Sequence, residues 1–182
     1  MENKRAFIFR TRRLEVRAFA PEDHARLSEI GGKADVARML STVKAPWSDA
    51  DVKSWIDESV YKQKLGYRAG VYLPDGKLIG FVGVGGTPPS CAFAIDSTYQ
   101  GNGYATEAVE GLLVHAFEAL DAQTLEAEHF ADNSKSGKVL RKLGFQKLGE
   151  GIGKSAARLE PAPIVLYRLT KQQFKAAKHE IS

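Results

Sequence analysis

The segment Gln100–Glu107 (QGNGYATE) carries the clearest chemical signal in the sequence. It lies between an apolar stretch that predicts a strand and the most regular helical pattern of the chain. Its two glycines let the backbone turn sharply and approach a ligand without obstruction by a Cβ atom. The first N–H groups of the following helix have no intrahelical partner, and the helix dipole adds positive potential. The segment is suited to hold a phosphate or pyrophosphate; a strand-to-helix turn whose glycines serve geometry alone is the alternative.

Other kinds of phosphate site and metal sites fit the sequence poorly. A dinucleotide fingerprint needs a third glycine at fixed spacing, and a Walker loop needs Gly-Lys-Ser/Thr; neither follows here. The four histidines are scattered, and Cys91 is the single cysteine. No spacing typical of metal ligands results, so we expect no metal site.

Length and charge set wider bounds on the protein. A chain of 182 residues favours one domain, spanning residues 1–182. The longest nearly apolar stretch, 78–86, is far shorter than the roughly 20 residues of a membrane helix. Residues 1–13 are charged too often for a signal peptide, and a lone cysteine cannot form an internal disulfide. A net charge of +4 is a weak signal for nucleic-acid binding. We expect a cytoplasmic protein with neither a membrane nor a nucleic acid as partner.

Apolar patterns predict the strands that position this loop. Pro74-Asp75-Gly76 between two apolar runs is typical of a hairpin turn. Alternation or continuous apolar character predicts strands at about 14–19, 66–73, 77–84, 91–95, 124–130, 145–150 and 163–169.

Capping residues and a period of 3.6 predict the helices. Ser48 can cap a helix with Val52, Trp55, Ile56 and Val60 on one face. The apolar positions of 105–120 follow helical spacing without a miss. Helices are expected in two stretches of 21–41, from Ser48, over 105–120 and over 134–143, where Gly144 ends the last one. This order indicates an α/β (α+β) protein with one layered sheet covered by helices.

The glycine loop resembles the acyl-CoA pyrophosphate motif of the GNAT superfamily of N-acetyltransferases, Q-x-x-G-x-A, at Gln100–Ala105. The wider run Tyr99–Ala108 is similar to the branch of ribosomal-protein N-terminal (alanine/serine) acetyltransferases. That branch's N-x-x-S and K-L-G-F pieces match Asn133 with Ser136, and then Lys142–Phe145. Residues 11–17, 21–23 and 77–80 resemble its opening strand, first helix and central strand, so the resemblance spans about 11–169.

The resemblance implies the GNAT fold. That fold has a mixed central sheet, here of about six to seven strands, with helices on both faces. Two of its parallel strands splay apart to form the acetyl-CoA cleft, and here they would be Cys91–Ile95 and Thr124–Phe130. The expected domain has its core at about 11–169, and 170–182 form a polar C-terminal tail or helix.

The resemblance also implies acetyl-CoA as cosubstrate and names its binding residues. Backbone groups of Phe93 and Ile95 would bond the pantetheine like an added strand. Asn133 would bond the pantetheine amide and Ser136 would lie near the sulfur. Lys135, Lys138 and Arg141 would meet the 3′-phosphate or form a solvated helix face. The pyrophosphate would be held by the backbone of Gln100, Gly101, Asn102, Gly103, Tyr104 and Ala105, with the Thr106 hydroxyl nearby.

Catalytic groups are harder to assign. Many relatives have a glutamate where this chain has Ser90, and many superfamily members have a tyrosine where it has Leu140. Ser136 is then the best remaining donor of a proton to the thiolate, its alternative being capping or packing. Glu128 shares a strand face with Glu126 and is the favoured general base, against a surface carboxylate or a water chain. On the opposite face, His129 is expected to be a satisfied core residue, and Glu107 to support the helix start.

The expected reaction is direct attack of a primary amine on the thioester. A free α-amine, with a pKa of about 8, needs less help to lose its proton than a lysine, with a pKa of about 10.4. The acceptor is a protein N-terminus of the ribosomal-protein type or a small-molecule amine, and Trp47, Trp55 and Tyr61 line its groove or simply pack. Alternatives are a catalytically weak CoA-binding regulatory module and a nucleic-acid or ribosome-associated protein. The oligomeric state stays open between monomer and homodimer.

Overall fold

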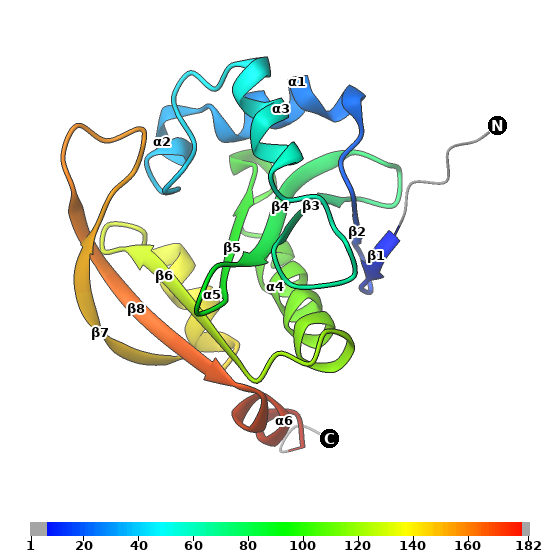
Figure 1. Ribbon diagram of the computed structural model, residues 1–182, viewed down its shortest axis with the longest axis vertical. Helices are drawn as coiled ribbons and strands as arrows, with labels where there is room; N and C mark the ends of the chain where they lie inside the picture. Colours follow the sequence, from blue (N-terminus) through cyan, green and yellow to red (C-terminus); the bar gives the residue numbers. More distant parts are fainter. Residues whose placement is uncertain (1–6, 180–182) are drawn as a thin grey trace.

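Eight strands form one mixed sheet in the order β1-β2-β3-β4-β5-β6-β8-β7, in a computed structural model that describes residues 7–179 (Figure 1). The strands are β1 (Phe7–Arg10), β2 (Glu15–Arg17), β3 (Tyr67–Tyr72), β4 (Leu78–Gly85), β5 (Ser90–Ile95), β6 (Thr124–Phe130), β7 (Gln146–Gly153) and β8 (Ala162–Thr170). The helices are α1 (His24–Gly31), α2 (Ala34–Ala37), α3 (Asp49–Asp57), α4 (Tyr104–Val114), α5 (Ser134–Lys142) and α6 (Lys171–His179).

The sheet opens between β5 and β6. These two strands run parallel and pair only at Ser90 with Glu126 and at Cys91 with Ala127. Beyond these residues the strands diverge, and β6, β8 and β7 form the second wing of the sheet (Figure 1). The expected splayed pair is therefore confirmed.

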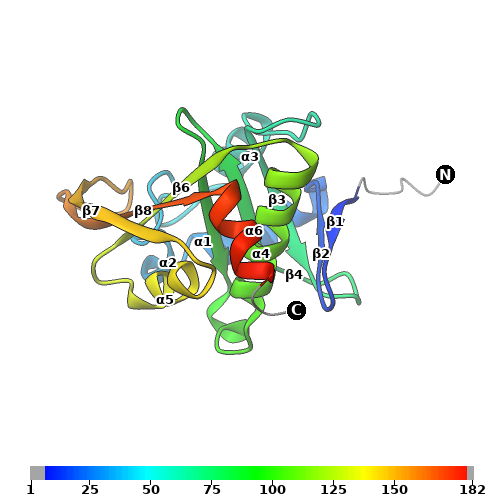
Figure 2. The same ribbon diagram turned by 90° about the horizontal axis from the view of Figure 1, so that it is seen from below.

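Helices cover both faces of the sheet, as expected. On one face α4 packs on β4 and β5, with Val82, Val109 and Leu112 in a common core. On the other face α1 and α3 lie over β4, where Trp55 meets Phe81 edge to face at 5.0 Å. Figure 2 shows α4 and α6 together on the side away from α1. The two cores fix β5 and the start of α4 relative to each other.

The eighth strand, β1, is absent from the expected set. Its residues pair with β2, and Phe9 packs against α4 at Gly111, where an added Cβ would lie 2.6 Å from the ring. This strand depends on a contact about 100 residues away in the chain. Local periodicity carries no sign of such a contact.

The helix expected over 105–120 is α-helical only to Val114. Residues 115–119 form a π-helical turn, which begins at the buried His115. The imidazole of His115 bonds the hydroxyls of Tyr61, at 3.2 Å, and Tyr67, at 2.9 Å. Val60, expected on the apolar face of the third helix, lies beyond its end and is exposed.

Local signals placed the start of α3 and the end of α5 correctly. The Ser48 hydroxyl accepts a hydrogen bond from the backbone N–H of Asp51 and caps α3. Gly144 has φ +88° and follows α5, in the left-handed conformation that glycine tolerates. The C-terminal segment is helical as α6. Within residues 7–179, no helix is long and apolar enough to cross a membrane.

Candidate active site

A cavity of about 880 Å³ lies where β5 and β6 separate. Its walls come from β5, the loop before α4, the end of β6 and the start of α5. Among the residues expected to bind acetyl-CoA or to catalyse, those lining it are Phe93, Ile95, Gln100, Gly101, Gly103, Tyr104, Ala105, Thr106, Glu128, Asn133 and Ser136.

The glycine loop has the conformation that its sequence predicts. Gly101 and Gly103 have φ +83° and +79°, and Gly103 is the N-cap of α4 without any side-chain cap. The N–H groups of the first turn are therefore left for a ligand. Gln100 braces the loop: its amide donates to the Ile95 carbonyl at 3.0 Å, and its Oε1 accepts from Lys135 at 3.0 Å. The Ile95 carbonyl is thus already bonded.

Two residues of the expected set, Asn102 and Arg141, do not line the cavity. The Asn102 side chain is exposed and donates to the carbonyls of Tyr99 and Gln100, so it holds the loop rather than lining the cavity. Arg141 donates to the Tyr167 hydroxyl at 3.3 Å and does not line the cavity, whereas Lys135 and Lys138 do. Only the first two turns of α5 face the opening.

Asn133 and Ser136 lie together at the start of α5. The Asn133 Oδ1 accepts from the Ser136 backbone N–H at 3.3 Å, which caps the helix. Capping uses the carbonyl oxygen of the Asn133 amide and leaves its NH₂ group as a donor beside the cavity. The expected ligand residue is thus also a structural one.

The two glutamates of β6 differ in their surroundings. Glu126 is ion-paired with Arg168 at 2.7 Å. Glu128 is exposed and lines the cavity, and its carboxylate forms no hydrogen bond or ion pair within residues 7–179. The buried His129 bonds the Phe130 carbonyl at 2.8 Å and the Tyr167 hydroxyl at 3.2 Å, so it is a satisfied core residue as expected.

Glu107 anchors the start of α4 to the turn between β1 and β2. Its carboxylate accepts from the Thr11 hydroxyl at 2.7 Å, the Arg13 backbone N–H at 2.7 Å and the Arg13 Nε at 2.6 Å. Burial alone would raise the pKa of this carboxyl, but the hydrogen bonds from Thr11 and Arg13 outweigh it and lower the pKa. The side chain supports the loop and stays ionised at neutral pH.

Replacing Glu107 with glutamine is expected to destabilise the fold by about 1–2 kcal/mol, since charge-assisted bonds are exchanged for weaker neutral ones. The loss is expected above about pH 4 and to shrink at lower pH, because a carboxyl with a lowered pKa stabilises only while it is ionised. Urea unfolding at pH 7 and pH 3 measures this. Glu110→Gln, exposed on the same helix, is the control, and equal effects of the two changes would contradict the role.

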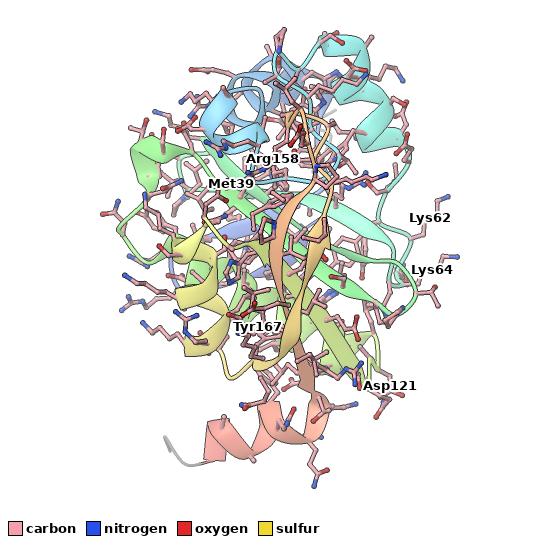
Figure 3. All side chains as sticks on the ribbon, turned by 90° about the vertical axis from the view of Figure 1, so that its left-hand side faces the viewer. Met39, Lys62, Lys64, Asp121, Arg158 and Tyr167 are labelled. Carbon is pink, nitrogen blue, oxygen red and sulfur yellow. The ribbon has the colours of Figure 1, made fainter. Side chains whose placement is uncertain are left out.

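Several lining residues come from 35–41, a stretch that was expected to be helical but in which no residue was predicted to belong to the site. Asp35, Val36, Met39, Leu40 and Ser41 form one wall. The loop between β7 and β8 closes on them, since Arg158 donates to the Arg38 carbonyl at 2.7 Å and bonds Asp132. Figure 3 shows Arg158 close to Met39. Only the folded chain brings these segments together.

The three aromatic residues expected at an acceptor groove lie in different surroundings. Trp47 is buried and packs edge to face on Trp55 at 5.1 Å. Tyr61 packs against Tyr67 and His115. Trp55 lines a second and smaller cavity, on the α3 side of the sheet.

Comparison with known proteins decides what this architecture is. The sequence model of the Acetyltransferase (GNAT) domain family matches residues 13–146. The chain belongs to this family. The matched residues include the glycine loop and both strands that open the cleft.

Similar proteins extend this match. The uncharacterized N-acetyltransferase YoaA of Bacillus subtilis (strain 168) is 32% identical over 97 residues, which cover 50% of this chain and 55% of YoaA. The chain thus spans about half the length of the curated relatives it matches.

Solved structures share the fold. Spermidine N-acetyltransferase from Vibrio cholerae, in complex with CoA and spermine, has a TM-score of 0.76 at 15% identity, covering 90% of this chain and 98% of that one. Ribosomal-protein-S5-alanine acetyltransferase from Vibrio fischeri has a TM-score of 0.69 at 19% identity, covering 91% and 97%. At these identities the likeness shows the fold alone.

Proposed function

We propose that this GNAT enzyme transfers an acetyl group from acetyl-CoA to a primary amine. A single observation carries the proposal: the cavity at the divergence of β5 and β6 ends at the uncapped N-terminus of α4. One long ligand that joins an anionic group to an extended chain fits such a site. The proposal takes residues 1–182 as one acetyltransferase domain with its core at about 11–169. It places the enzyme in the cytoplasm, in keeping with its single cysteine.

Residues that line the cavity would make most of the expected contacts. The backbone N–H groups at the start of α4 would hold the pyrophosphate. The open edge of β5 near Phe93 would bond the pantetheine as an added strand. The amide NH₂ of Asn133 would donate to a pantetheine carbonyl, while its oxygen caps α5. Lys135 and Lys138 would pair with the 3′-phosphate.

Transfer would proceed by direct attack. The amine forms the new C–N bond, the C–S bond breaks, and a backbone N–H on β5 donates to the carbonyl oxygen. Glu128 is our candidate for the base that takes the amine proton, because its carboxylate lies at the cavity and has no partner among residues 7–179. Ser136 is our candidate for the donor that returns a proton to the thiolate. The acceptor is a protein N-terminus or a small-molecule amine, and solved structures of similar fold include enzymes named for each kind.

Calorimetric titration with acetyl-CoA tests the proposal. Micromolar binding is expected, with no binding of ATP or NAD. Asn133→Ala is expected to weaken binding by about tenfold, in line with the loss of one or two hydrogen bonds. Release of free thiol on addition of amines would then show turnover.

Two control variants separate binding from capping at Asn133. Asn133→Asp keeps an oxygen that can cap α5 but removes the donor, so it is expected to weaken binding as well. Ser48→Ala removes a cap from α3, away from the cavity, and is expected to leave binding unchanged. Folded protein that binds acetyl-CoA without turning it over would favour the regulatory-module alternative. Folded protein that does not bind it would refute the enzyme proposal.

A further inference from the structure

A second cavity, of about 330 Å³, lies on the α3 side of the sheet. It exists because the residues of β4 and β5 that face this side are small. In register, Gly83 lies opposite Ala92 and Gly85 opposite Ser90. These four residues line the cavity, and Trp55 lines it from α3. Its volume is at the lower end of the range for ligand pockets.

The two cavities share one wall residue, on β5. Ala92 lines both the larger cavity and the smaller one. It follows Cys91, the last β5 residue paired with β6. A ligand in the small cavity would therefore lie beside the residue at which the cleft opens. Under the function proposed above, that is where the acceptor amine has to meet the thioester.

Arg68 is fixed in the wall of this small cavity. It pairs with Gly83 across the sheet, and Gly83 pairs in turn with Ala92, so the three residues form one row on one face. At the usual strand spacing the ends of this row are about 10 Å apart. An added Cβ on Gly83 would lie 3.0 Å from the Arg68 Cγ, so the missing side chain leaves room for the arginine.

Hydrogen bonds hold the guanidinium of Arg68 through one of its nitrogens. Its Nη1 donates to the Trp55 carbonyl at 2.7 Å and to the Ser59 hydroxyl at 3.1 Å, and it lies over the Trp55 ring at 4.4 Å. Nε and Nη2 have no hydrogen-bond partner among residues 7–179. These two groups form the edge that binds a carboxylate with two parallel hydrogen bonds.

The small cavity has a positive charge inside, from Arg68, and a negative charge at its margin, from Glu58. Glu58 is the other charged lining residue within the described chain, and its side chain is 65% exposed against 25% for Arg68. The two are 4.0 Å apart, without a hydrogen bond. A polycation entering this space would meet a fixed guanidinium, whereas an anionic group would satisfy it.

We propose that Arg68 binds a carboxylate of the acceptor. The acceptor is then an amine with a carboxylate a few atoms away, and a polyamine is disfavoured. A free amino acid supplies this chemistry, and so does a peptide with an acidic N-terminal residue. The inference rests on the proposed function and narrows its acceptor.

Matched acceptors test it with thiol release as the readout. The panel is the common amino acids against their amides, short peptides starting with Asp or Glu against Asn or Gln, and spermine. In the wild type, the best carboxylate acceptor is expected to exceed its amide in kcat/KM by about tenfold or more. The amino-acid and peptide arms show which source of the carboxylate is used. Preference for amides or for spermine would overturn the inference.

Variants assign the preference to Arg68. Arg68→Gln is expected to bring the ratio of acid to amide close to one. Arg68→Lys is expected to restore it in part, because a point charge lacks the paired donors. Lys64→Gln removes the same charge from an exposed residue that projects away from the body (Figure 3) and is expected to keep the ratio.

Acetyl-CoA binding and thermal unfolding of each variant report whether the fold is kept. An unchanged ratio in folded Arg68→Gln would overturn the inference and leave the proposed function standing. Binding of acetyl-CoA without acetylation of any amine in the panel would overturn both.

Discussion

Replacing Ala105 with aspartate is expected to weaken acetyl-CoA binding by about 100-fold or more and to leave the protein at least as stable. Ala105 is the second residue of α4 and lines the large cavity. A carboxylate there lies next to the proposed pyrophosphate. Two unit charges about 5 Å apart repel by about 3 kcal/mol at the effective dielectric near a protein surface. The same carboxylate interacts favourably with the positive end of the helix dipole.

The opposite signs of the two effects make this prediction specific. A variant that merely damages the fold would lose stability and binding together. Ala50→Asp is the matched control, because Ala50 is the second residue of α3, is exposed and lines neither cavity. It is expected to bind acetyl-CoA like the wild type. Calorimetry and thermal unfolding of the three proteins decide the matter, and wild-type affinity in Ala105→Asp would place the pyrophosphate elsewhere.

The sequence predicted the parts of this site that are local. The loop needs two residues with positive φ, and the glycines at 101 and 103 predict these positions. The helix that follows shows its apolar face by period alone. Asn133 was found through the resemblance to the GNAT superfamily, because it matches the N-x-x-S piece of that family. The splayed strands came from the resemblance to the GNAT superfamily rather than from any residue pattern.

Contacts between distant segments could not be predicted in this way. In the sequence, Arg68 is one polar residue in an apolar strand. Its place in a cavity wall depends on Gly83, Ala92 and Trp55, which lie beside it only in the folded chain. Met39 enters the cavity wall because the loop carrying Arg158 closes on it. Such positions are set by tertiary packing, for which neither periodicity nor propensity provides a signal.

Asp96 is one of these long-range contacts. Its side chain is 1% exposed and bonds Arg26 and Lys33, the latter at 3.1 Å, as well as the backbone N–H of Thr98 at 3.2 Å. It follows β5 directly and precedes the glycine loop, so it ties that loop to α1 and the residues after it. Burial alone would raise the pKa of this carboxyl, but the hydrogen bonds from Thr98, Lys33 and Arg26 lower it to about 2.

Asp96→Ala is expected to destabilise the protein by about 3 kcal/mol at pH 7, because it leaves two cations without their buried partner. The sign of the pH dependence follows from the lowered pKa. An unfolded aspartate titrates near pH 3.9, so the stabilisation is complete above that pH and is lost as pH falls toward about 2. The difference between wild type and variant should therefore shrink between pH 4 and pH 2. Urea unfolding across this range measures it.

An exposed ion pair provides the comparison. Asp121 pairs with Lys171 at 2.6 Å but its side chain is 79% exposed, so Asp121→Ala is expected to cost less than about 1 kcal/mol. Asp96→Ala should also weaken acetyl-CoA binding in protein that is still folded, because the loop loses its anchor to α1, whereas Asp121→Ala should not. Equal stability losses in the two variants would mean that Asp96 acts as an ordinary surface charge. A large loss with unchanged affinity would mean that the loop keeps its shape without this anchor.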